Sequence, residues 1–385
     1  MKNRSALGLL FLVVFVDLLG FGMVIPVMPL YAERLGASEA ATGWLSTGYS
    51  LMQFVFAPVW GGLSDRIGRR PVLLLSIAMT SVGFLGYALA PSFGWLLASR
   101  LFAGAATANI AIAQAYVADV TPPEGRARGM GIIGAAFGLG FVLGPAIGGL
   151  LSVRSLATPG FAAAGLALFN LVAAVILLPE PAQRSPAARR RRIAALWEEM
   201  HKPGIRRLLA IYLLIILAFS AMESTYSFLA QQRYGLSARH VAWVFAYIGV
   251  IVVLVQGGLI GPLTRRLGEK RLLVAGAVLQ GLGLASLPFA HGVPGLLAAT
   301  APLAVGSGLA SPAITALISR LSRAEDQGGT LGIGQSAAAM GRIVGPLSGT
   351  WSFSHWQAAP YLAGAALMAA AAAIGASVRG PRAES

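Results

Sequence analysis

The sequence predicts an all-α polytopic membrane protein, with twelve transmembrane helices in two six-helix, pseudo-symmetric halves. Three observations predict this fold. The composition is apolar and poor in charge, long apolar stretches follow one another, and the second half repeats features of the first. Of 385 residues, 56% are hydrophobic and 11% are charged, whereas soluble domains carry about 25% charged residues because their surface faces water. Lipid is therefore the expected solvent of the outer surface.

The apolar stretches are long enough to be membrane spans, since crossing about 30 Å of hydrocarbon takes about 20 helical residues. We predict spans at residues 6–31, 42–63, 72–91, 94–118, 130–152, 160–179, 207–230, 239–263, 271–290, 294–318, 328–351 and 358–378. Each is expected to be helical, because a lone strand would leave its backbone groups unbonded in lipid. The first stretch is too long for a signal peptide, whose apolar region has about 7–15 residues.

The positive charge predicts membrane orientation. Although the formal charge is +15, the basic residues lie in short loops between apolar runs, which does not favour a nucleic-acid partner. If the N-terminus is cytoplasmic, cytoplasmic segments hold 23 of the 29 Lys and Arg residues. We expect a multi-pass protein of the cell (inner) membrane with both termini cytoplasmic. Residues 180–206 then form a cytoplasmic basic linker between bundles at 1–179 and 207–385, and contact of its basic run with membrane lipid is the less favoured alternative.

The two halves share sequence features at a constant spacing. Four residues of the loop after the second predicted span recur 200 residues later: Gly61, Leu63, Arg66 and Gly68 match Gly261, Leu263, Arg266 and Gly268. The pair Gly144-Pro145 recurs 201 residues later as Gly345-Pro346. Parallel repeats of this kind are typical of a large transporter fold that binds substrate near the membrane midplane, between the halves.

Two acidic side chains lie inside predicted spans, where ionisable groups are costly and therefore indicate function. Asp17, in the middle of the first span, is predicted to bind a proton or a cationic substrate; the alternative is a hydrogen-bonded structural acid. Glu223 shares a helical face with Phe219 and Tyr226. An acid among aromatic rings suits a lipophilic cation, while the alternative is an ion pair with Arg233 near the outer mouth.

Arg100, in the fourth span, completes the candidate proton-coupling set of Asp17, Arg100 and Glu223. It is predicted to neutralise Asp17 or to bias a proton relay, and the alternative is that it extends toward the interface. Polar or aromatic side chains within spans are candidates for substrate binding, although each alone is also typical of helix packing. They are Tyr49, Gln53, Phe56, Gln114, Phe219, Tyr226, Gln335 and Arg342.

The charged loop 61–70 is a candidate gate. Asp65 and Arg69 are spaced to form an ion pair, which can be made in one state and broken in another, and Asp119 can extend the network. Arg66 and Arg70 complete the group, although positive charge that only orients the chain is the alternative.

A glycine-rich run at 134–149 lacks the preceding strand and the lysine of a nucleotide loop. Small residues in a span favour close helix approach. Gly144-Pro145 is also a place where a helix could flex during gating.

These residues resemble the major facilitator superfamily, in particular its tetracycline-resistance-like, drug:proton antiporter branch. The matching residues are Asp17 with Gly20, Gly22, Pro26 and Pro29, then the loop 61–70, Arg100 with Gly104, and the run 134–149. The resemblance implies proton-driven export by alternating access, with Asp17 in coupling, Arg100 assisting proton transfer and Asp65 and Arg69 in gating. Two departures stand out. Gly83 stands where the tetracycline exporters have an acid, which argues against tetracycline itself as the substrate. In the second half Arg265 stands where the first half has Asp65, so only the first of the two charged loops is expected to form an intact latch, that is, the ion pair of the gate.

The sequence therefore predicts an exporter of small amphipathic compounds that is driven by proton antiport. No cysteine is present, and we find no nucleophile–base pair or metal-ligand set inside the spans. We accordingly expect no enzyme activity, no metal and no cofactor beyond the proton as coupling ion, in a monomer. Two alternatives stay open: a transporter of an endogenous lipid or metabolite, and a non-transporting sensor on the same fold.

Overall fold

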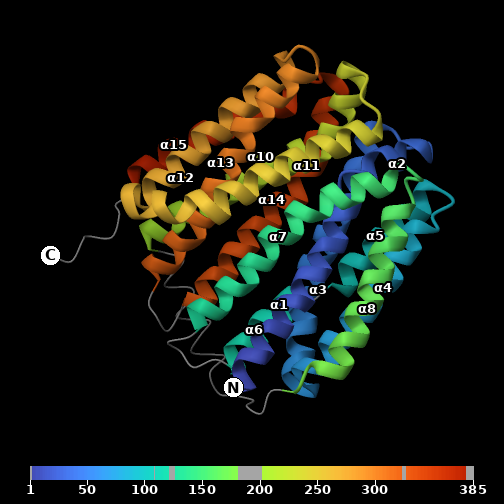
Figure 1. Ribbon diagram of the computed structural model, residues 1–385, viewed down its shortest axis with the longest axis vertical. Helices are drawn as coiled ribbons and strands as arrows, with labels where there is room; N and C mark the ends of the chain where they lie inside the picture. Colours follow the sequence, from blue (N-terminus) through green and yellow to red (C-terminus); the bar gives the residue numbers. More distant parts are fainter. Residues whose placement is uncertain (1, 108, 121–125, 181–201, 323–326, 379–385) are drawn as a thin grey trace. The chain divides into compact units, whose positions relative to one another are not determined.

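Helices make up almost all of the structure (Figure 1). The computed structural model describes residues 2–107, 109–120, 126–180, 202–322 and 327–378, and none of these residues forms a strand. The helices before the basic segment are α1 (Lys2–Val24), α2 (Met28–Arg34), α3 (Glu39–Ile67), α4 (Arg69–Ala88), α5 (Phe93–Ala106), α6 (Asn109–Val120), α7 (Arg126–Ser152) and α8 (Thr158–Leu177). Those after it are α10 (Pro203–Tyr234), α11 (Ala238–Leu254), α12 (Ile260–Ser286), α13 (Gly292–Leu321), α14 (Gln327–His355) and α15 (Ala359–Ser377).

The predicted spans are helical over most of their length, but three are interrupted or distorted within their length. The first is interrupted by a turn at 25–27 before α2, and the fourth is divided between α5 and α6. The eighth runs from α11 through a π-helical turn, η2 (Val255–Leu259), into α12. Seven helices of the described residues are long and apolar enough to cross a membrane. The polytopic all-α fold is thus confirmed, and the number of twelve spans stays a prediction.

The chain divides into two compact units. Unit 1 comprises Met1–Pro186 and Ala230–Ala246, and unit 2 comprises Ala187–Leu229 and Tyr247–Ser385. Most of the predicted linker, residues 181–201, lies outside the described residues. The bundle boundaries predicted from the sequence therefore stay a prediction.

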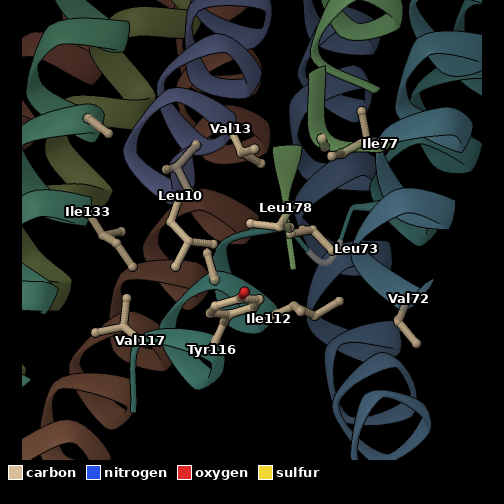
Figure 2. Close-up of a cluster of buried hydrophobic side chains, with 14 of the residues drawn as sticks. Leu10, Val13, Val72, Leu73, Ile77, Ile112, Tyr116, Val117, Ile133 and Leu178 are labelled. Atoms are coloured by element: carbon tan, nitrogen blue, oxygen red, sulfur yellow. The ribbon is translucent and has the colours of Figure 1, made fainter. Parts of the chain in front are cut away.

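In unit 1, α1 packs against α7 and α8, α4 packs against α5 and α8, and α3 packs against α5. One apolar cluster joins α1, α4, α6 and α7 through side chains such as Leu10, Leu73, Tyr116 and Ile133 (Figure 2). It holds the inner faces of four helices together, because a helix buries its apolar stripe against its neighbours. In unit 2, α12 packs against α13 and α15.

Glycines bring helix backbones close together at equivalent places in the two units. A Cβ added at Gly144 of α7 would lie 2.7 Å from the Cα of Gly22 in α1. A Cβ added at Gly345 of α14, 201 residues later, would lie 2.8 Å from the carbonyl oxygen of Leu217 in α10. Both distances are too short for a side chain. The predicted close helix approach is confirmed, whereas flexing at Gly144 and the adjacent, buried Pro145 stays a prediction.

Candidate functional site

The first candidate site surrounds Asp17, which is 7% exposed in the middle of α1. Its Oδ1 accepts a hydrogen bond from Nδ2 of Asn109, the first residue of α6, at 2.8 Å. Asn109 is fully buried, and its own Oδ1 has no hydrogen-bond partner. Sequence reasoning missed Asn109. The sequence feature that could have identified Asn109 is a carboxamide in the middle of an apolar span, where a polar group needs a hydrogen-bonding partner.

Arg100 of α5 lies in the same unit and is only 1% exposed. Its guanidinium carbon lies 4.4 Å from the centre of the Tyr49 ring and 5.6 Å from that of Phe21, at cation–π distance. The ion pairs between described side chains do not include Arg100 with Asp17. Neutralisation of Asp17 by direct pairing is therefore not seen. The alternative, extension toward the surface, is wrong because the cation is buried and lies against two aromatic rings.

The other predicted binding residues of unit 1 differ in their surroundings. Tyr49 is buried and its hydroxyl donates to Oγ1 of Thr107 at 3.2 Å. Phe56 packs against the apolar cluster of Figure 2, while Gln53 and Gln114 are half-buried. Tyr49 is thus brought together with Arg100, and Phe56 takes part in packing.

A second group of polar side chains gathers in unit 2. The charge of Arg342 in α14 acts on both Glu223 and Tyr212 of α10. Tyr212 also receives a hydrogen bond from Nε2 of Gln335, at 3.5 Å. The electrostatic interaction of Glu223 is with Arg342, and the ion pairs between described side chains do not include the alternative, Glu223 with Arg233. Arg342 is thus linked to Glu223, whereas Gln335 is bonded to Tyr212, which lies eleven positions before Glu223 in α10.

The two aromatic residues predicted to flank Glu223 have different environments. Tyr226 is 1% exposed, and its hydroxyl shares a 3.0 Å hydrogen bond with Oγ1 of Thr300 in α13. Phe219 is half-buried. The helix positions agree with a shared face, but Tyr226 is engaged in packing against α13.

The predicted gate forms a compact charge cluster at the α3–α4 junction, called here the latch: Asp65, Arg69 and Asp119. Nη1 of Arg69 lies 2.7 Å from Oδ1 of Asp65, and its Nε lies 2.9 Å from Oδ2 of Asp119 in α6. Nη1 also donates to Oγ of Ser64 at 2.6 Å. One guanidinium therefore joins α3, α4 and α6, as the sequence predicted.

Glu180, which follows α8, supports the latch and was missed by sequence reasoning. Its two carboxylate oxygens accept from the backbone N–H groups of Arg69 and Arg70, at 2.8 and 2.9 Å. These are the first N–H groups of α4, and Gly68 at the N-cap offers no side-chain acceptor. The helix dipole also stabilises an acidic side chain at this N-terminal end of α4. Arg70 further donates from Nη2 to the carbonyl of Val175.

The remaining latch-loop residues have different roles. Gly68 has φ 113° and ψ 158°, a conformation essentially restricted to glycine. Gly268, 200 residues later, has φ 77° and ψ 157°. Arg66 is exposed in the last turn of α3.

Unit 2 contains an ion pair at the place equivalent to Arg69–Asp119, with the charges exchanged. Glu269 stands 200 residues after Arg69, and Arg320 stands 201 residues after Asp119. Nη1 of Arg320 lies 2.7 Å from both carboxylate oxygens of Glu269. Unit 2 thus has a counterpart of the Arg69–Asp119 contact, while the ion pairs between described side chains include none of Arg265, so the expectation that only the first latch is complete stays a prediction. At the three equivalent positions, Arg265, Glu269 and Arg320, the residue types have the opposite charge to Asp65, Arg69 and Asp119.

The arrangement suits transport chemistry. A carboxylate buried in an apolar helix bundle can exchange a proton or bind a cation, and an ion-pair cluster at the helix ends can open and close. The two lie in one unit and share α6.

Comparisons with known proteins agree with this reading. The sequence model of the Major Facilitator Superfamily matches residues 10–260 and 251–385. The tetracycline resistance protein, class C, of Escherichia coli is 34% identical over 95% of both chains. Multidrug resistance protein 2 of Bacillus subtilis is 29% identical over 87% of this chain and 86% of its own length.

Among solved structures, the human organic anion transporter MFSD10 superposes with a TM-score of 0.75 at 24% identity, covering 97% of this chain and all of that one. At this identity the match supports the fold. Together with the sequence matches, it shows that the chain is a multi-pass membrane protein and belongs to the Major Facilitator Superfamily of transporters.

Proposed function

We propose that the protein is a secondary active exporter of small amphipathic, drug-like compounds, driven by proton antiport through alternating access. The observation that carries the proposal is Asp17, a buried carboxylate in the middle of α1 whose hydrogen bond comes from a neutral carboxamide, that of Asn109. Such a site can bind a proton and release it when its surroundings change. The names of the tetracycline and multidrug resistance relatives support export of drug-like compounds.

The second unit supplies the rest of the proposed machinery. Glu223 and Arg342, together with Gln335 and its partner Tyr212, are proposed to contribute to proton coupling and substrate binding. A carboxylate that interacts electrostatically with a guanidinium can exchange that interaction for one with a cationic substrate. The proposed working form is a monomer in the cell (inner) membrane with cytoplasmic termini, using the proton and no cofactor.

The latch is proposed to work as a gate on the cytoplasmic side. Arg69 binds two carboxylates from two other helices, so separating these helices breaks both contacts together. Glu269–Arg320 is proposed to act as the corresponding gate of unit 2. Ion pairs that are partly exposed suit this role, because water can solvate the separated charges.

The test uses purified protein in liposomes with an imposed pH gradient. Lipophilic cations, tetracyclines, other drugs and lysolipids are added, and proton flux and substrate flux are recorded for wild type, Asp17→Asn and the control Glu33→Gln. Glu33 is an exposed acid of α2. We expect substrate-triggered proton flux in wild type and in Glu33→Gln, and none in Asp17→Asn.

Two results would contradict the proposal. Substrate movement without proton flux, unchanged in Asp17→Asn, would indicate a transporter that is not an antiporter. Binding of a compound without movement of any compound would indicate a sensor.

A further inference from the structure

The fourth predicted span is two helices in the structure. α5 ends at Ala106, Thr107 is extended with φ −77° and ψ 107°, and α6 begins at Asn109. A break within a span frees backbone carbonyl groups from the helical ladder. In lipid such groups need other partners, so discontinuous helices in transporters occur where the protein supplies them.

Side chains from neighbouring helices bond the carbonyl groups at this break. Nε1 of Trp60 in α3 donates to the carbonyl of Ala105 at 2.6 Å. Oγ of Ser76 in α4 donates to the carbonyl of Ala106 at 2.7 Å. The end of α5 is therefore fixed to α3 and α4, and α6 starts as a separate helix. The two carbonyl groups at the discontinuity are thus satisfied by other helices of the same unit.

α6 is bonded to both candidate sites of unit 1. Its first residue, Asn109, donates to Asp17 at 2.8 Å, and Asp119 near its other end accepts from Arg69 at 2.9 Å. These two residues of α6 are ten positions apart, or about 15 Å at a rise of about 1.5 Å per residue. We propose that α6 is a rigid link that transmits the charge state of Asp17 to the latch, with Asn109 as the positioning residue. The proposal rests on the proposed function, in which Asp17 carries the coupling proton.

The bond between Asn109 and Asp17 is suited to sensing charge. A hydrogen bond to an ionised carboxylate is about twice as strong as one between neutral groups. The Oδ1 of Asn109 has no partner and its side chain is fully buried, so Asp17 fixes its position. Neutralising Asp17 weakens the attachment of α6 at this end. Because α6 is separated from α5, it can then shift without unwinding the rest of the span.

Few ionisable side chains surround the contact between Asn109 and Asp17. Among the helices packed against α1, α8 has no ionisable residue and neither do the described side chains of α7. α6 itself carries Tyr116 and Asp119 toward its far end. The buried cation Arg100 lies over the Phe21 ring, one turn further along α1 than Asp17. The hydrogen bond from Asn109 is thus the direct polar contact through which α6 responds to Asp17.

The test exploits the absence of cysteine from the chain. Ser64→Cys places one thiol beneath Arg69 at a position 2% exposed, so its reaction rate with N-ethylmaleimide reports opening of the latch. Ala113→Cys, at a fully buried position of α6, reports movement of the link itself. Ala163→Cys, fully buried in α8, reports general loosening of the unit.

Each reporter is combined with Asp17→Asn, with Asn109→Ala and with the matched control Asn170→Ala. Asn170 of α8 is also buried, also lacks a partner for Oδ1, and also donates to α1, but to the carbonyl of Val13 at 3.0 Å. We expect Asp17→Asn and Asn109→Ala each to raise the labelling rates at 64 and 113 by about tenfold, as loss of a charge-assisted hydrogen bond implies. The two changes together should have no larger effect than either alone.

Three results would overturn the proposal: no change at 64 and 113 in Asn109→Ala, an equal change in Asn170→Ala, or a parallel change at 163. If Ser64→Cys alone opens the latch, the Ala113→Cys reporter decides. Labelling needs no substrate and no proton gradient, so the outcome is separate from that of the flux assay. Retained proton flux in Asp17→Asn would show that Asp17 does not carry the coupling proton. The labelling rates would then still decide whether α6 links Asp17 to the latch.

Discussion

Replacing Arg69 by glutamate reverses the charge at the centre of the latch. In the structure this guanidinium lies 2.7 Å from Asp65 and 2.9 Å from Asp119. After the substitution, three carboxylates converge on one point with no cation between them. We expect the latch to open, because the α3, α4 and α6 ends that it joined now repel one another.

The magnitude follows from the exposure of the side chains. Breaking a fully buried ion pair costs about 3–5 kcal/mol, and breaking an exposed one costs about 0.2–1 kcal/mol. Arg69 and Asp119 are 18% and 22% exposed, and Asp65 is 45% exposed. The latch lies between the two limits, so we expect a loss of about 2 kcal/mol, with most of it from Asp119. This corresponds to a shift of about 30-fold in the equilibrium between closed and open latch.

Unit 2 suggests how to restore the latch. There the equivalent positions hold Arg265, Glu269 and Arg320, and Glu269 pairs with Arg320 at 2.7 Å. The triple variant Asp65→Arg, Arg69→Glu, Asp119→Arg copies this arrangement into unit 1. It should return the equilibrium to within about threefold of wild type, because attraction between opposite charges does not depend on which helix carries which sign.

The assay is the maleimide labelling rate of a single cysteine at position 64. We expect a rise of about 30-fold in Arg69→Glu and recovery in the triple variant. The matched control is Arg66→Glu, which reverses an exposed charge in the same loop and should leave the rate nearly unchanged. The reasoning is refuted if the triple variant labels as fast as Arg69→Glu, or if Arg66→Glu has an equal effect.

Two further predictions concern stability, measured as the thermal midpoint of the purified protein. Gly148→Ala should destabilise the protein by about 1–3 kcal/mol or more, because the new methyl group would lie 2.0 Å from the carbonyl oxygen of Met23. At Gly165 an added Cβ would meet no atom of a neighbouring helix within 4 Å, so Gly165→Ala should cause no loss. An equal loss in both variants would contradict the packing argument. Glu180→Ala should cost about 1 kcal/mol through loss of the cap on α4, whereas Glu180→Gln, which keeps one acceptor oxygen, should cost less; an unchanged midpoint in Glu180→Ala would show that water replaces the cap.

Several features of the candidate sites could be predicted from sequence because they depend on local chemistry. An acid such as Asp17 in a long apolar stretch indicates a buried functional group whatever the rest of the fold does. The spacing of Asp65 and Arg69 predicted their ion pair, and the glycines around Gly144 predicted close helix contact. Arg100 is buried, as its position in an apolar stretch suggested, but its aromatic partners Tyr49 and Phe21 were not predicted.

Partners from distant segments could not be predicted. Asn109 and Asp17 are 92 positions apart, and Glu180 lies 111 positions from Arg69. Nothing in the spacing of such residues indicates that they meet, because their distance depends on how whole helices are arranged. The Glu269–Arg320 pair was missed for a related reason. Sequence comparison of the halves looked for the same residue types, whereas an ion pair survives when both charges are exchanged.

The sequence by itself determined that this chain is an all-helical membrane protein with an internal repeat, since lipid requires apolar surfaces and internally bonded backbones over each span. It also indicated which charges are costly to bury and are therefore candidates for function. Only the tertiary structure decided that the fourth span is divided into α5 and α6, because the side chains of Trp60 and Ser76 that bond the free carbonyls come from other helices. For the same reason, only the structure shows that one short helix carries both the partner of Asp17 and a residue of the latch.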